Sequence, residues 1–68
     1  MNTAPCKILV VDDEAIPRML LRTNLAEAGY IVQDADSGKK ALQLLREEPF
    51  DVVLLDLIIP EQHLLQQL

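Results

Sequence analysis

Three aspartates in this chain follow apolar runs, and their carboxylates are suited to holding a hard metal ion. Asp12 and Asp13 come directly after Lys7–Val11, and Asp56 ends the stretch Asp51–Asp56. Mg²⁺ prefers oxygen ligands, and it typically takes one or two carboxylates while keeping waters or phosphate oxygens. In the simpler interpretation, Asp12 and Asp13 are helix-capping residues and Asp56 is an ordinary strand end.

The two apolar runs that precede these aspartates are typical of buried strands. Residues 52–55 are four apolar residues, two of them β-branched, between two carboxylates. A run this short favours a strand buried on both faces over a helix, and burial on both faces implies a parallel sheet. Open α/β sheets bind ligands at the carboxyl ends of their strands, which is where the aspartates fall.

Helical spacing follows the first strand. Residues 14–28 form a predicted helix that Asp13 can cap and that Gly29 closes as the C′ residue. One broad stripe of this helix is predicted to carry the following side chains: Ile16, Met19, Leu20, Thr23 and either Leu25 or Ala26. Residues 30–35 then mix apolar and polar side chains, as a strand at a sheet edge does.

Ser37 is the predicted cap of a second helix over about residues 38–48, which Pro49 stops. Its apolar face consists of Ala41, Leu42, Leu44 and Leu45. After the strand 51–56, residues 61–68 predict a short third helix. Residues 1–6 are an expected tail, and residues 7–68 form one domain.

The element order β-α-β-α-β-(α) predicts a parallel sheet with right-handed crossovers. With helices on both faces, the strand order is 2-1-3, so the first and third strands end side by side. Asp12, Asp13 and Asp56 then form one cluster. Three like charges oppose folding unless a cation neutralises them, which favours a metal site.

Composition excludes several function classes. The 68 residues carry 11 acidic and 6 basic side chains, and the net charge of −5 disfavours nucleic-acid binding. No apolar segment is long enough to span a membrane, and the N-terminus lacks a signal peptide pattern. The single cysteine, Cys6, suits a reducing compartment, so we expect a cytoplasmic protein.

The order and spacing of these segments resemble the receiver domains of two-component response regulators across about residues 7–60. The resemblance is carried by Lys7–Glu14, Gly29-Tyr30, Ala35–Gly38 with Ala41-Leu42, Asp51–Leu57 and Ile59-Pro60. It implies half of a flavodoxin-like, doubly wound parallel sheet.

The resemblance also implies roles for individual residues. Asp56 matches the aspartate that accepts a phosphoryl group from a histidine kinase. Asp12 and Asp13 match the acidic pair that binds Mg²⁺, with Asp56 and the backbone carbonyl of Ile58 as the remaining protein ligands. A cation between an attacking carboxylate and an anionic phosphoryl group agrees with this chemistry.

The chain also departs from the family pattern. Receiver domains have five βα units, whereas we expect this chain to be truncated to the N-terminal half. The family's Ser/Thr after the fourth strand and Lys after the fifth have no counterpart here. We therefore expect weak Mg²⁺ binding and impaired phosphotransfer.

Truncation leaves the 51–56 strand with a bare edge, and apolar edges are association sites. We expect a homodimer formed through this edge or through the face of Leu64, Leu65 and Leu68. The leading hypothesis is a truncated receiver-like module, not an enzyme, that works by binding itself or a partner. The alternatives are a working phosphoacceptor at Asp56 in a homodimer and a receiver fragment without a function.

Overall fold

A computed structural model describes residues 4–56 of the chain. Its elements are β1 (Lys7–Asp12), α1 (Ala15–Glu27), β2 (Ile31–Ala35), α2 (Gly38–Glu47) and β3 (Val52–Asp56). These confirm the five elements expected from the sequence. The predicted helix over 61–68 lies outside the described residues, as do Ile58 and the face of Leu64, Leu65 and Leu68.

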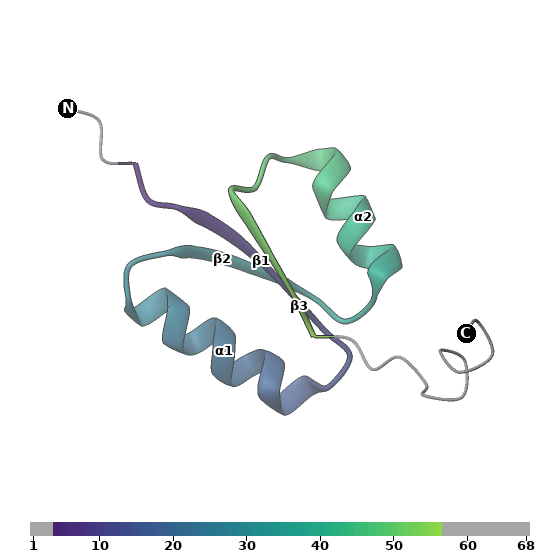
Figure 1. Cartoon of the computed structure of the whole chain (residues 1–68), viewed down its shortest axis with the longest axis horizontal. Coiled ribbons are helices and arrows are strands. Elements are labelled where there is room, and N and C mark those ends of the chain that lie inside the picture. The colour runs from purple at the N-terminus through teal and green to yellow at the C-terminus, as the bar shows by residue number, and fades with distance from the viewer. Residues whose placement is uncertain (1–3, 57–68) are drawn as a thin grey trace, which may run out of the picture.

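The three strands form one parallel sheet in the order β2-β1-β3, as predicted. The helices α1 and α2 lie on opposite sides of this sheet (Figure 1). The chain moves from β1 to β2 in one direction across the sheet and then from β2 past β1 to β3 in the opposite direction. Because both crossovers are right-handed, the two helices lie on opposite faces. The described part is therefore an open α/β sheet with β1 at its centre.

The core is built on β1. Leu9 and Val11 are completely buried, and they form one cluster with Ala35 of β2 and Ala41 of α2. Leu44 and Phe50 pack partly buried against that cluster. Because side chains alternate along a strand, Ile8, Val10 and Asp12 point to the other face of the sheet. The centre of the sheet is thus apolar up to Val11 and then becomes acidic.

Helix α1 presents a different face to the sheet from the one predicted. Ile16 is 71% exposed, and Met19 and Leu20 are exposed as well. The half-buried residues are Arg18, Leu21 and Leu25. The predicted stripe was wrong because apolar side chains occur on several sides of this helix. Its orientation depends on contacts that helical periodicity does not reveal.

Two predicted helix boundaries are confirmed in detail. The side chain of Ser37 accepts a hydrogen bond from the backbone N–H of Lys40 at 3.2 Å, which caps α2. Gly29 follows α1 with φ +100°, a left-handed conformation in which a side chain is unfavourable. None of the helices in the described part is long and apolar enough to cross a membrane.

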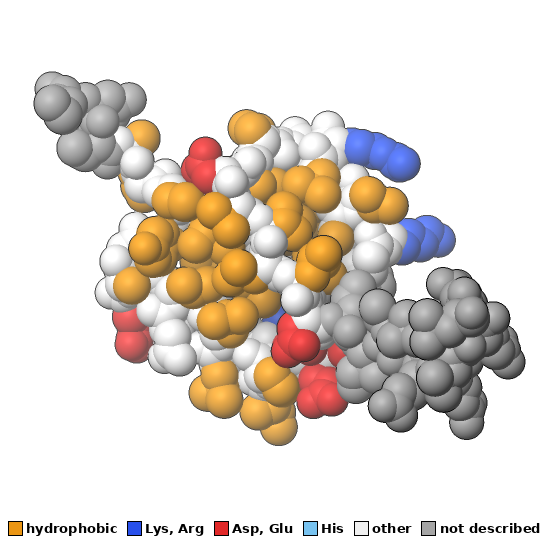
Figure 2. All heavy atoms as spheres, in the orientation of Figure 1, with side chains coloured by type: hydrophobic (Ala, Val, Ile, Leu, Met, Phe, Trp, Pro, Cys, Tyr) orange, Lys and Arg blue, Asp and Glu red, His pale blue; other side chains and the backbone are white. Residues whose placement is uncertain are grey.

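Strand β3 lies at the edge of the sheet, and every one of its residues is exposed. The expectation that it is buried on both faces is therefore wrong for residues 4–56, where Leu55 is 68% exposed. The expected bare edge is instead found. Figure 2 shows hydrophobic side chains gathered on the face where Figure 1 places β3.

Candidate functional site

The candidate site lies at the carboxyl ends of β1 and β3. The parallel register pairs Asp12 with Asp56, so the last residues of the two strands are direct neighbours. Paired residues on adjacent strands point to the same face. Asp12 is only 4% exposed, whereas Asp56 is open to solvent. The adjacency expected from the sequence is thus present for these two aspartates.

Asp13, unlike Asp12 and Asp56, lies outside the paired strands. It follows β1 and is exposed, and within residues 4–56 no group of three or more His, Cys, Asp or Glu side chains is arranged to hold a metal ion. Ile58 lies outside the described residues. The ligand set of Asp12, Asp13, Asp56 and the Ile58 carbonyl therefore stays a prediction.

The chain turns after β1, and the side chain of Asp12 accepts a hydrogen bond within that turn. Its Oδ1 accepts a hydrogen bond from the backbone N–H of Glu14 at 2.9 Å. Glu14 occupies the N-cap position of α1, and its side chain makes no capping hydrogen bond. The predicted cap by Asp13 was wrong, because the N-cap residue is Glu14 and the carboxylate beside its backbone N–H is that of Asp12.

Contacts at the opposite end of the sheet hold β3 in the register that aligns the aspartates. The backbone N–H of Lys7 donates to Asp51 Oδ2 at 2.7 Å, and the N–H of Asp51 donates to the Lys7 carbonyl at 2.8 Å. The Lys7 ammonium also pairs with Glu48 and lies 5.0 Å from the centre of the Phe50 ring. These contacts align the start of β3 with β1, and five residues later Asp56 lies beside Asp12.

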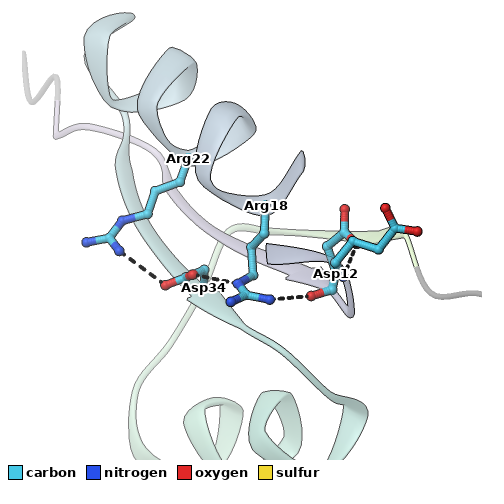
Figure 3. A network of polar contacts seen from close by, with 5 residues as sticks. Asp12, Arg18, Arg22 and Asp34 are labelled. Atoms are coloured by element: carbon cyan, nitrogen blue, oxygen red, sulfur yellow. Dashed lines mark hydrogen bonds and ion pairs between the residues drawn. The ribbon is translucent and has the colours of Figure 1, made fainter. Parts of the chain in front are cut away.

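A polar network beneath the site was not expected from the sequence. Arg18 Nε donates to Asp34 Oδ2 at 2.9 Å, and Arg18 Nη1 donates to the backbone carbonyl of Asp12 at 2.9 Å. Arg22 Nη1 lies 3.4 Å from Asp34 Oδ1 (Figure 3). The sequence offers one signal, an acidic residue in the second strand and two arginines one helical turn apart. That signal does not identify the Asp12 carbonyl as a partner.

The donor set fits Mg²⁺. Two carboxylates on neighbouring strand ends provide hard oxygen ligands, and Mg²⁺ commonly binds through one or two carboxylates with water in its other positions. Because Asp12 is already oriented by the turn, a cation would not need to order it. Asp12 and Asp56 are the described residues that the strand register brings together, and their carboxylates would hold the ion.

Comparison with known proteins identifies the family. The model of the response regulator receiver domain matches residues 8–66 of the chain. The chain therefore belongs to the receiver-domain family of response regulators in two-component signalling. Receiver domains generally bind Mg²⁺ at their phosphorylation site. No solved structure gives a significant match.

Several curated proteins share this stretch. A probable transcriptional regulator ycf27 of Guillardia theta is 47% identical over 55 residues, covering 81% of this chain and 22% of the relative. The transcriptional regulatory protein ResD of Bacillus subtilis is 45% identical over 59 residues, covering 87% and 25%. A probable cyclic di-GMP phosphodiesterase of Vibrio cholerae is 43% identical over 60 residues, covering 88% and 13%.

The chain thus spans about a quarter or less of the length of these relatives, between 13% and 25%. Their names describe different outputs, transcriptional regulation in two cases and a phosphodiesterase in the third. What the chain shares with all of them is the receiver portion.

Proposed function

We propose that this chain is a cytoplasmic receiver module that works by protein association. Its partner is a second copy or another two-component protein such as a histidine kinase. The observation that carries the proposal is the exposure of β3, in which Val52, Val53, Leu54 and Leu55 are all open to solvent at the sheet edge. Unpaired apolar edges are templates for strand addition.

The sheet geometry favours antiparallel pairing of two β3 strands. A two-fold axis perpendicular to the sheet relates the same face of the two copies. A side chain on one face therefore pairs only with side chains on that face. Asp51 and Asp56 are separated by an odd number of positions and therefore point to opposite faces. Their carboxylates never oppose each other in such a dimer. Pairing over the full strand centres on Leu54, and the two three-stranded sheets become one continuous sheet.

Sedimentation velocity tests this dimer at micromolar concentrations. We expect the wild-type chain to sediment as a dimer and Leu54→Lys as a monomer, because two lysines would face each other on the axis. Ile31→Lys is the matched control, since Ile31 is an exposed residue on the other edge strand. It should leave the dimer intact. A monomeric wild-type chain, or a Leu54→Lys dimer of unchanged stability, would refute pairing through β3.

A second function, phosphorylation of Asp56, is favoured by the register that pairs Asp56 with Asp12. In this reaction an Asp56 carboxylate oxygen attacks the phosphorus of a phosphodonor, the bond to the donor's leaving group breaks, and an acyl phosphate forms. Bound Mg²⁺ would supply positive charge between the carboxylate and the phosphoryl group. Asp12 and Asp56, with Asp13 and the Ile58 carbonyl as further proposed ligands, would hold it there.

We propose that the 68 residues by themselves would accept a phosphoryl group at Asp56 only slowly. The 68 residues contain no counterpart of the family's Lys and Ser/Thr, which follow later strands. Loss of one hydrogen-bond donor to a developing negative charge costs roughly 10²–10³ in rate. Both proposals involve β3, because Asp56 is the last residue of the strand that forms the proposed interface.

Incubation with acetyl phosphate and Mg²⁺, followed by mass spectrometry of the intact chain, tests Asp56. The expected product carries one phosphoryl group, survives acid and is lost in base. Asp56→Asn should abolish it, and Asp36→Asn, which changes an exposed aspartate of the β2–α2 connection, should not. If the wild-type chain gives no adduct even after an incubation ~10³-fold longer than a complete receiver needs, the phosphoacceptor function is wrong.

A further inference from the structure

Arg18 connects the candidate site to the rest of the sheet. Its guanidinium reaches two strands at once, donating to the Asp12 carbonyl at the end of β1 and to Asp34 on β2, each at 2.9 Å (Figure 3). The side chain is largely buried, with 18% of its surface exposed. Guanidinium is planar and presents its donors in a fixed arrangement, so it defines the relative position of both acceptors.

Asp12 is consequently held at two points. Arg18 fixes its carbonyl, and the backbone N–H of Glu14 fixes one oxygen of its carboxylate at 2.9 Å. The direction of the backbone at a strand end determines where the side chain leaves the sheet. A shift of the Asp12 carbonyl would therefore move the carboxylate relative to its neighbour Asp56.

We propose that Arg18 is a positioning residue of the acidic site: by holding the Asp12 carbonyl, it sets the geometry in which Asp12 and Asp56 bind a divalent cation. This inference rests on the proposed Mg²⁺ site. Partners that orient metal ligands typically contribute about 10–100-fold to metal affinity. Arg18 contacts no reacting atom and acts through Asp12.

Charge and position have opposite effects on cation binding. Removing a nearby positive charge would strengthen the attraction of the acidic site for Mg²⁺, whereas losing the Asp12 contact would weaken binding. Asp34 Oδ2 lies 2.9 Å from Arg18 Nε and offsets part of the positive charge of Arg18, and Arg22 pairs with the same carboxylate. We expect the loss of position to be the larger effect, so that replacement of Arg18 weakens cation binding.

A Mg²⁺ titration followed by amide NMR shifts of Asp12, Asp13 and Asp56 tests this inference. Arg18→Met should raise the dissociation constant by ~10-fold or more. Arg18→Lys should have an intermediate effect, because it keeps the charge without the two-acceptor geometry. Arg22→Met is the matched control. Within the described part, Arg22 pairs with Asp34 and makes no hydrogen bond to Asp12, so affinity should stay within about twofold.

A second measurement keeps the inference separate from the metal site. Hydrogen exchange of the Glu14 amide reports the turn held by Asp12, and exchange of the Leu9 amide reports the sheet as a whole. Arg18→Met, or Arg18→Lys if the methionine variant does not fold, should accelerate exchange at Glu14 and leave Leu9 unchanged.

The outcomes distinguish the two ideas. A wild-type chain whose amides do not respond to Mg²⁺ refutes the proposed metal site, and Glu14 exchange then decides the role of Arg18 alone. Unchanged Mg²⁺ affinity in Arg18→Met, an equal loss in Arg22→Met, or unchanged Glu14 exchange would overturn the assignment of Arg18.

Discussion

Replacing Asp56 with asparagine should stabilise the metal-free chain. The β1–β3 register places Asp56 beside Asp12, so two negative charges lie at neighbouring strand ends. Asparagine keeps the size of the side chain and removes one of these charges. Most single substitutions destabilise a protein. Stabilisation would therefore be a specific sign of repulsion between the two carboxylates.

The size of the effect can be estimated by taking the spacing of adjacent strands as the distance between the two carboxylates. Adjacent strands are ~4.8 Å apart. Two unit charges at ~4.8 Å repel by ~0.9 kcal/mol in water and by ~3.5 kcal/mol at an effective dielectric constant of ~20. Because Asp12 is 4% exposed but Asp56 is open to solvent, the lower value is the better guide. We expect a gain of about 1 kcal/mol, or ~4–8 °C in Tm for a domain of this size.

Thermal and urea unfolding followed by far-UV circular dichroism measures this gain at one fixed protein concentration, with a chelator present. Asp36→Asn changes the net charge equally without altering the strand pair, so it should shift Tm much less. Excess Mg²⁺ should reverse the ranking, because a bound ion at 100 times its dissociation constant stabilises by ~2.7 kcal/mol and Asp56→Asn lacks one of the proposed metal-binding carboxylates. Asp56→Asn that is no more stable than Asp36→Asn would refute the reasoning.

Three further predictions concern the scaffold, and urea unfolding measures all of them. Leu9→Ala removes a completely buried side chain and should lower the free energy of unfolding by about 2.7–5 kcal/mol. Leu20→Ala, on the exposed side of α1, should lower it by at most ~0.5 kcal/mol. Similar losses in the two variants would mean that the core is not built on β1. Gly29→Ala places a side chain at φ +100° and should cost ~1–2 kcal/mol of stability. Gly38→Ala should not destabilise the chain, because a Cβ there meets no atom within 4 Å. Equal effects of the two substitutions would contradict the left-handed conformation of Gly29. Ser37→Ala should cost ~1 kcal/mol and Ser37→Asp should retain the cap; a Ser37→Asp variant as unstable as Ser37→Ala would count against the capping hydrogen bond.

The order of elements could be predicted because local rules decide it. Short apolar runs, a cap at Ser37 and a left-handed residue at Gly29 each act within a few positions of the chain. Once three short strands alternate with helices, right-handed crossovers leave few topologies, and the 2-1-3 order follows. The adjacency of Asp12 and Asp56 was predictable for the same reason.

The orientation of α1 and the contacts of Arg18 could not be predicted in this way. Apolar residues at Ile16, Leu20, Leu21 and Leu25 allow several faces of the helix to pack, and periodicity does not choose among them. The choice depends on where the Asp12 carbonyl and the Asp34 carboxylate point after the sheet has formed. The sequence by itself thus determined which residues end the strands and in what order those strands lie. Only the tertiary structure decided that Arg18 is the residue of α1 that contacts β1 and β2. The Arg18 contacts join three elements, and no local pattern encodes the relative positions of those elements.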